Sequence, residues 1–251
     1  MKNKLSLVIV NLLTITRLLG TIMLPIIARY SNVKVLIVYL VLIFLTDTLD
    51  GFLARRLNVS TIFGAILDAF ADKVFGIVTI YIISRSYPIM ILPILVELLI
   101  TFVKTDGATR GSGIESSYLG KFKTWVFGIC TVIAYLVLYS ADFIVMLESM
   151  NNYSLKILDI FNYILDNDGV IMSGLAFIMV GADIMVTFDY INKVKDDTKK
   201  AKMTGIKRKN YRLKKGNELY FVLFDHDYYI ETKNQPLLVR IGEEVKNDSK
   251  N

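Results

Sequence analysis

Cysteine and histidine are nearly absent from the 251-residue sequence. The one cysteine, Cys130, has no partner for an internal disulfide bond, which excludes a disulfide-stabilised scaffold. The one histidine, His226, lies between two aspartates near the C-terminus, and we interpret it as a turn residue rather than a ligand. Apolar residues make up 54% of the chain, and this proportion excludes intrinsic disorder.

Charge is also missing from long stretches of the chain. Crossing a hydrocarbon core of about 30 Å takes roughly 20 helical residues, and the stretch from Thr124 to Ala141 contains no charged residue at all. Such runs exclude a soluble α/β domain and a coiled coil, and they predict an all-α integral membrane protein with six transmembrane helices. The predicted spans are residues 11–30, 35–56, 60–84, 87–105, 122–141 and 169–191.

The distribution of Lys and Arg between these spans predicts the orientation of the protein. Basic residues concentrate at both termini and in the second and fourth connections, so the positive-inside rule places both termini in the cytoplasm of a multi-pass protein of the cell membrane. Residues 1–10 carry two lysines, but no small-residue cleavage site follows them, which argues against a signal peptide. We expect an amphipathic surface helix that leads into the first span.

The composition changes after residue 192, and we divide the chain into a membrane domain, 1–192, and a basic cytoplasmic tail, 193–251. The domain holds 14 basic and 14 acidic residues and the tail holds 15 and 9, so the net charge of +6 belongs to the tail. Because the tail follows a membrane helix directly, we expect it to meet anionic lipid rather than nucleic acid. Apolar residues on both sides of Asp225–Asp227 predict a β-hairpin in a small, β-rich appendage.

Four aspartates interrupt the second and third predicted spans. Residues three, four or seven positions apart share a face of a helix, so small residues and aspartates form one stripe on each span. A short turn near Arg56–Ser60 would let the two stripes face each other, and the four carboxylates would converge. The stripes are Asp47, Asp50, Gly51 and Ala54 on the second span, and Gly64, Asp68, Asp72 and Gly76 on the third.

Four converging carboxylates need a cation. An aspartate near the bilayer centre costs at least ~2.5 kcal/mol on insertion scales, like charges repel, and the flanking spans do not supply four matching cations. A divalent metal satisfies these groups, and clustered carboxylate oxygens favour Mg²⁺ or Mn²⁺ completed by the phosphate oxygens of a substrate. Helix packing alone would explain Gly64 and Gly76, but it would not explain four aspartates in register.

The motif Asp-x2-Asp-Gly-x2-Ala-Arg-x8-Gly-x3-Asp-x3-Asp, which begins at Asp47, resembles the signature of the CDP-alcohol phosphatidyltransferases at all eight positions. The resemblance covers about residues 1–192. It implies a six-helix membrane fold, a homodimer, and a reaction in which an alcohol hydroxyl displaces CMP from a CDP-linked lipid such as CDP-diacylglycerol. It also implies that Asp47, Asp50 and Asp68 bind the metal, and that Asp72 is the general base and a further metal ligand.

The resemblance extends to the residues around the CDP group. The first span carries the run Asn11-Leu-Leu-Thr14-x2-Arg17, which is similar to the family's first span, whose polar residues face the nucleotide. The CDP-lipid-binding residues implied by the resemblance are Asn11, Thr14, Arg17, Gly51, Ala54, Arg55 and Thr61.

The acceptor alcohol is predicted from a shorter motif. Residues 120–124, Gly-Lys-Phe-Lys-Thr, resemble the phosphatidylglycerophosphate synthase branch, whose acceptor is glycerol 3-phosphate. Lysine stands at 104 where that branch has an arginine, and valine at 96 where it has another, and lysine lacks the bidentate fork of arginine. The predicted acceptor-binding residues are Lys104, Arg110, Lys121 and Lys123.

Alternatives stay open at this point. The same chemistry could use phosphatidylglycerol, which gives cardiolipin, or serine. The chain could also be a catalytically inactive membrane scaffold whose tail recruits a partner, or a transporter that uses the aspartates as a cation path.

Overall fold

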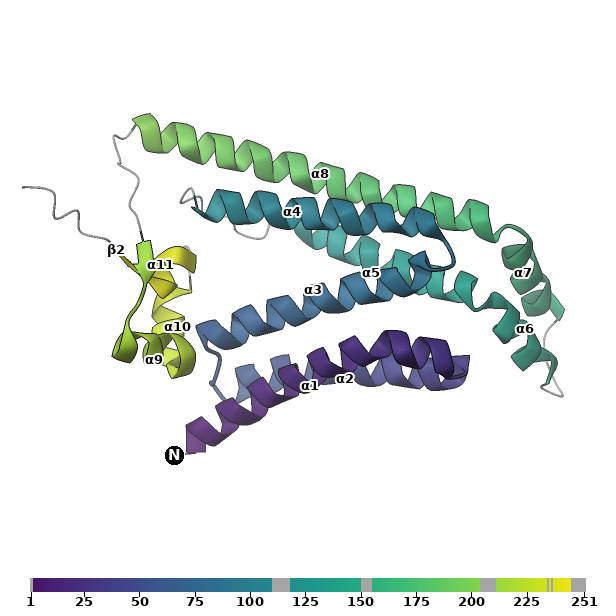
Figure 1. Ribbon diagram of the computed structural model, residues 1–251, viewed down its shortest axis with the longest axis horizontal. Coiled ribbons are helices and arrows are strands. Elements are labelled where there is room, and N and C mark those ends of the chain that lie inside the picture. The colour runs from purple at the N-terminus through teal and green to yellow at the C-terminus, as the bar shows by residue number, and fades with distance from the viewer. Residues whose placement is uncertain are drawn as a thin grey trace, which may run out of the picture.

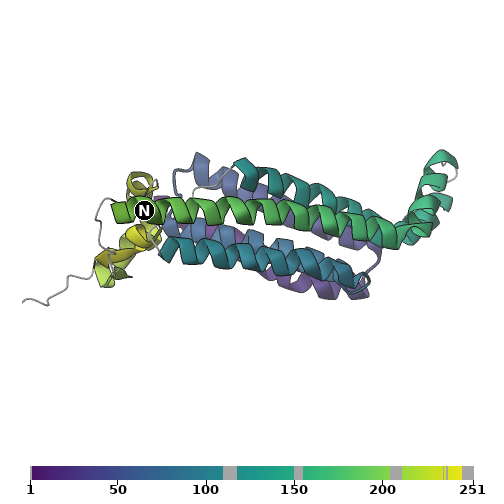
Figure 2. The same ribbon diagram turned by 90° about the horizontal axis from the view of Figure 1, so that it is seen from above.

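Helices account for nearly all of the residues that the structure describes. The computed structural model describes residues 2–109, 118–149, 155–203, 211–233, 235 and 237–244. Long helices run side by side, and two groups of short elements lie at opposite ends of the bundle (Figures 1 and 2). The chain's N-terminus and the C-terminal short elements lie at the same end (Figure 1).

The elements follow one another in this order. The bundle consists of α1 (Lys2–Tyr30), α2 (Val33–Arg56), α3 (Ile62–Ser84), the short 3₁₀ helix η1 (Pro88–Met90), α4 (Ile91–Thr109), α5 (Tyr118–Leu138) and α8 (Asp168–Met203). Between α5 and α8 lie α6 (Ser140–Glu148) and α7 (Leu155–Asp166). The C-terminal appendage consists of β1 (Tyr211–Leu213), α9 (Gly216–Phe224), α10 (His226–Thr232), α11 (Leu237–Ile241) and β2 (Gly242–Glu244).

The long helices coincide with the six predicted spans, but not all of them have the composition of a membrane span. Within the described residues, four helices are long and apolar enough to cross a membrane: Ser6–Tyr30, Val33–Arg56, Tyr118–Leu138 and Asp168–Asp196. Helix α3 carries Asp68, Asp72 and Lys73 in its middle, and α4 belongs to a shorter apolar stretch, Pro88–Val103. The protein is therefore an all-α, multi-pass membrane protein, and six complete spans stay a prediction.

The N-terminal residues do not form a helix of their own. They are the first turns of α1, which continues without a break to Tyr30. No glycine or proline occurs before Gly20, so nothing in this segment favours an end to the helix there. The predicted surface helix is thus continuous with the first long helix.

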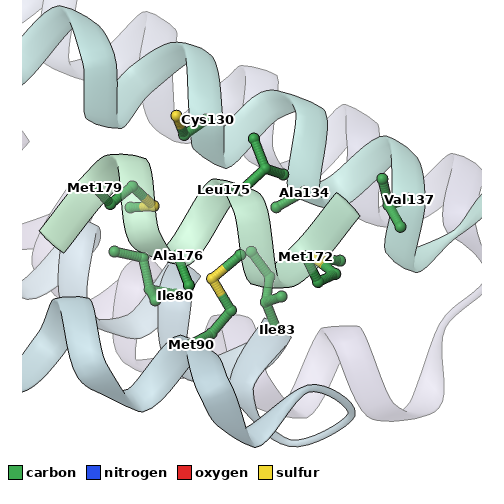
Figure 3. Close-up of a cluster of buried hydrophobic side chains, with 10 residues drawn as sticks. All are labelled: Ile80, Ile83, Met90, Cys130, Ala134, Val137, Met172, Leu175, Ala176 and Met179. Carbon is green, nitrogen blue, oxygen red and sulfur yellow. The ribbon is translucent and has the colours of Figure 1, made fainter. Parts of the chain in front are cut away.

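Helix α3 joins two halves of the bundle. On one side it packs with α1 and α2 around Leu24, Leu36 and Ile43. On the other side, α5 and α8 close over Ile80 and Ile83 of α3 (Figure 3). That second cluster also contains Met90, Cys130, Ala134, Val137, Met172, Leu175, Ala176 and Met179. The position of α3 therefore depends on both halves at once.

Large apolar side chains also cover the outside of the bundle. Phe44, Phe102 and Phe177 are each more than 60% exposed, although they lie on long apolar helices. Soluble monomers rarely expose large contiguous apolar patches. Lipid around the bundle accounts for these outward-facing residues.

The predicted β-hairpin at Tyr220–Ile230 is wrong. Residues 220–224 belong to α9, and residues 228–230 belong to α10. The Asp225 side chain caps α10 by accepting hydrogen bonds from the backbone N–H groups of Asp227 and Tyr228, so a helix begins where the hairpin turn was predicted. The run 237–241, predicted as a further apolar segment, forms α11. A small antiparallel pair does exist, but it joins β1 to β2, whose residues are about 30 positions apart. The appendage is therefore mainly helical.

Overpacking tests the contact between α5 and α8. Ala134 is completely buried in the cluster of Figure 3, so Ala134→Phe has no space for its ring and should destabilise the protein by roughly 1–3 kcal/mol. Val132 on the same helix is 62% exposed, so Val132→Phe should leave the thermal unfolding midpoint unchanged. Equal effects of the two substitutions on that midpoint would contradict the packing described here.

Candidate active site

Carboxylates from α2 and α3 meet at one place in the bundle. One oxygen from each of Asp47, Asp50 and Asp68 lies within 4.8 Å of the other two. Asp50 is buried, whereas the side chains of Asp47 and Asp68 are partly exposed. The turn between the helices, residues 57–61, includes Asn58 in the left-handed region at φ 51°, which asparagine tolerates better than most residues. The predicted antiparallel pair thus brings three carboxylates together.

Asp72 lies beside this group, and Arg17 of α1 links it to the others. The Arg17 guanidinium pairs with Asp47, with Asp68 at 2.8 Å and with Asp72 at 3.1 Å. The flanking helix α1 thus supplies one cation, which agrees with the expectation that the flanking spans do not supply four matching ones. Arg17 itself is buried, and the Asp72 side chain is 60% exposed.

Thr14 holds the buried carboxylate. Its hydroxyl lies one helical turn before Arg17 and donates a hydrogen bond of 2.9 Å to Asp50 Oδ2. Both threonine and aspartate are buried, so this bond supports a carboxylate that has little water around it. Two residues predicted to bind the CDP-lipid, Thr14 and Arg17, therefore contact the carboxylates directly.

The donor set fits a divalent cation. One guanidinium charge offsets only one of four carboxylate charges, so an excess of negative charge remains on these side chains. Hard carboxylate oxygens grouped this closely suit Mg²⁺ or Mn²⁺. Asp47, Asp50 and Asp68 would hold the ion, and the exposed sides of Asp47 and Asp68 leave room for ligand oxygens from a substrate.

A glycine permits close contact between α1 and α3. A Cβ atom on Gly64 would lie 3.1 Å from Asn11 Oδ1 and 3.3 Å from the Thr61 hydroxyl oxygen. Thr61 is the N-cap of α3, and its side chain accepts a hydrogen bond from the Gly64 N–H at 3.1 Å. Thr61 is almost fully buried, so its observed contact is structural. Asn11 faces this same junction.

The remaining predicted CDP-lipid residues lie at the end of α2. The Arg55 guanidinium folds back over Gly51, where an added Cβ would lie 3.4 Å from Arg55 Nη1. Ala54 packs against Leu7, Val10 and Val59. Arg55 is exposed, so its charge is accessible to an anion.

The predicted acceptor-binding lysines have different surroundings. Lys121 is exposed, with its ammonium group over the Tyr118 ring at 5.9 Å from the centroid. Lys123 points into the bundle, where it pairs with Glu97 of α4 and with Asp183 of α8. Lys104 lies on α4, but its side chain is outside the described part of the structure, and Arg110 lies outside the described residues altogether.

Sequence reasoning missed two charged residues of the bundle. Asp183 is completely buried within the sixth predicted span, and Lys73 follows Asp72 and pairs with Glu97. A charged residue within an apolar span is itself a functional signal. That signal is present in the sequence around Asp183 and marks it as a candidate functional residue.

The appendage packs against the turn that joins α2 to α3. His226 Nδ1 lies 2.8 Å from the Ser60 carbonyl oxygen, and α9 packs on the start of α3. A cavity of about 560 Å³ lies between the appendage and the turn that joins α2 to α3. It is lined by Leu7, Asn58, Val59, Tyr220, Phe224 and residues 225–227. The interpretation of His226 as a turn residue is wrong, because His226 is the first residue of α10 and its ring contacts the turn before α3.

A known protein family matches most of the helix bundle in sequence. The sequence model of the CDP-alcohol phosphatidyltransferase family matches residues 7–154, which include most of α1, all of α2 to α6 and every aspartate of the site. The appendage and α8 lie beyond the matched residues. No solved structure matches the chain.

Curated relatives share a segment of the chain. The CDP-diacylglycerol–glycerol-3-phosphate 3-phosphatidyltransferase of Salmonella typhimurium (strain LT2) is 40% identical over 88 residues, which cover 32% of this chain and 48% of that protein. The protein of the same name from Escherichia coli (strain K12) is 40% identical over 87 residues, with the same coverage of both chains. The chain thus spans about half the length of the curated relatives it matches.

Two glycines on α3 provide a matched test of the site's geometry. Gly64→Leu should separate α1 from α3, because the new side chain would occupy the space of the Asn11 amide, and should cost roughly 1–3 kcal/mol. A Cβ at Gly76, on the same stripe, meets nothing within 4 Å, so Gly76→Leu should be tolerated. Thermal unfolding of both purified variants measures the difference, and a Gly64→Leu protein as stable as Gly76→Leu would contradict this helix contact.

Proposed function

Because the chain belongs to the CDP-alcohol phosphatidyltransferase family, we propose that it transfers a phosphatidyl group from CDP-diacylglycerol to glycerol 3-phosphate and releases CMP. The products would be CMP and phosphatidylglycerophosphate, a step of phospholipid synthesis. The observation that carries the proposal is the meeting of Asp47, Asp50 and Asp68 from two helices, with Asp72 beside them. The choice of glycerol 3-phosphate is supported by the names of the curated relatives and by the lysines of α5.

The proposed reaction is a displacement at phosphorus. The acceptor oxygen forms a bond to the phosphatidyl phosphorus, the bond between that phosphorus and the bridging oxygen of CMP breaks, and CMP leaves with the electron pair. Asp72 accepts the proton of the acceptor hydroxyl. Its side chain is exposed on one side and paired with Arg17 on the other, which leaves an oxygen accessible while Arg17 orients the group. A bound Mg²⁺ or Mn²⁺ supplies Lewis-acid neutralisation of the diphosphate charge.

Other residues of the chain bind and orient the substrates. Arg55 supplies an exposed positive charge next to Gly51, where the absence of a side chain lets a large anionic group approach the backbone. Asn11, Ala54 and Thr61 surround this end of α2 and α3 and shape the CDP site. Lys121 and Lys123, with Lys104 and Arg110, would bind the acceptor phosphate.

The proposal extends to orientation and assembly. With both termini in the cytoplasm, the carboxylates lie toward the cytoplasmic end of the bundle, where CDP-linked and phosphorylated substrates would reach them. We also propose that the protein is a homodimer, as its resemblance to the CDP-alcohol phosphatidyltransferases implies. Phosphatidylglycerol or serine as acceptor, an inactive scaffold and a cation path stay as competing hypotheses.

A panel of acceptors tests the proposed reaction. Purified protein supplied with CDP-diacylglycerol and Mg²⁺ or Mn²⁺ should release CMP and form lipid product with glycerol 3-phosphate, and chelation of the metal should stop the release. Product with another alcohol but not with glycerol 3-phosphate would overturn the acceptor assignment. Transmembrane cation flux without a CDP-lipid would favour the transporter hypothesis instead.

Asp72→Asn isolates the general base. The amide cannot accept the hydroxyl proton as the carboxylate does, so CMP release should fall by roughly 100-fold or more. Asp142→Asn is the matched control, because Asp142 is an exposed residue of α6, which lies at the end of the bundle opposite the N-terminus (Figure 1). Unchanged CMP release by Asp72→Asn would rule out its catalytic role.

A further inference from the structure

A second charged network crosses the bundle behind the carboxylates. Lys73 of α3 pairs with Glu97 of α4, Glu97 also pairs with Lys123 of α5, and Lys123 lies 3.1 Å from the carboxylate of Asp183 on α8. Lys73 also donates a 2.8 Å hydrogen bond to the hydroxyl of Thr101. Four helices are thus joined by alternating positive and negative side chains.

The network becomes more buried toward α8. The Lys73 side chain is 33% exposed, those of Glu97 and Lys123 are less exposed, and Asp183 is fully buried. Asp183 Oδ2 is buried with no hydrogen-bond partner among the described residues. A buried carboxylate of this kind is costly unless its charge is matched. Its pairing with Lys123 therefore has a strong influence on where that lysine lies.

Charge balance explains why Asp183 is needed. The network contains two ammonium groups and two carboxylates, so each positive charge has a negative partner. Without Asp183, Glu97 alone would face both lysines, which repel each other in a poorly solvated site. Lys73, the most exposed of the four, would be the group to leave Glu97 for water.

Lys73 in turn fixes the rotation of α3. Consecutive residues of an α-helix point about 100° apart, so Lys73 faces α4 while Asp72 faces Arg17 of α1. The interface of α3 with α4 is much smaller than its interface with α1. The pairing of Lys73 with Glu97 is therefore one of the contacts that hold α3 at this angle, beside the packing of Ile80 and Ile83, and Asp68 and Asp72 turn with the helix.

We propose that Asp183 and Lys73 are positioning residues, which act through Glu97 and Lys123 to hold Asp68 and Asp72 at the carboxylate site. Asp183 lies on α8, beyond the residues that match the family. The inference rests on the proposed function only for the identity of the bound ion. Asp183 and Lys73 affect the positions of the Asp68 and Asp72 carboxylates, and neither Asp183 nor Lys73 is assigned a contact with substrate.

Metal binding without turnover tests the proposal. The free Mn²⁺ signal in electron paramagnetic resonance gives the affinity of each purified variant. Asp183→Asn and Lys73→Met should each weaken Mn²⁺ binding roughly 10-fold, the lower end of the range for residues that orient metal ligands. Asp189→Asn is the control, because Asp189 lies on the same helix and pairs with Lys193 one turn later, and it should bind Mn²⁺ as the unmodified protein does.

A double variant tests the link across the bundle. Because both substitutions act through the same contact of α3, Asp183→Asn combined with Lys73→Met should weaken Mn²⁺ binding no further than either alone. Independent, additive losses would overturn the proposal. A lower thermal midpoint of Asp183→Asn with unchanged Mn²⁺ affinity would also overturn it, since that pattern identifies a purely structural charge pair.

Two further outcomes complete the test. If Asp183→Asn yields no folded protein, the Mn²⁺ affinity of Lys73→Met tests the proposal, because that substitution removes the same link at a partly exposed side chain. Unchanged Mn²⁺ affinity of Lys73→Met would overturn the proposal. Absence of Mn²⁺ binding by the unmodified protein would instead contradict the metal site of the proposed function. The two failures are therefore distinguishable.

Discussion

The central constraint on this protein is the repulsion among four carboxylates inside an apolar helix bundle. Arg17 is placed where three of them can share its charge, and Thr14 supports the fourth. One positive charge cannot balance four negative ones, so the arrangement holds together best with a divalent cation and the phosphates that such a cation attracts. The features that surround the site, from Gly64 to the turn at Asn58, keep three helices close enough for these groups to meet.

Helix α3 makes contacts with both halves of the bundle. It carries two of the carboxylates toward α1 and packs its far end against α5 and α8. Its charged middle is the reason that it lacks the composition of an ordinary membrane span. The same middle contains Lys73, whose partner Glu97 connects α3 to a buried charge network that ends at Asp183. Packing and charge pairing thus act together to set the angle of one helix.

The sequence predicted the long helices and the convergence of carboxylates because both depend on local, periodic patterns. Aspartates at three- and four-residue spacing define a helix face wherever that helix goes. The contact of Arg17 with these carboxylates was not predicted, since it depends on how α1 crosses α3, which no spacing encodes. The hairpin at Tyr220–Ile230 failed for a related reason: apolar residues around Asp-His-Asp suit a turn, but the Asp225 side chain caps a helix instead. Asp183 carries a signal of its own as a charged residue in an apolar span, but its pairing with Lys123 could not be predicted, because no periodic spacing links the two residues.

Anomalous diffraction from the protein with bound Mn²⁺ tests the account most directly. A peak surrounded by oxygens of Asp47, Asp50 and Asp68 is the predicted result, with Arg17 still paired to at least one of the neighbouring carboxylates. No peak at saturating Mn²⁺, with Arg17 paired to Asp47, Asp68 and Asp72 as it is here, would contradict the claim that these carboxylates form a metal site.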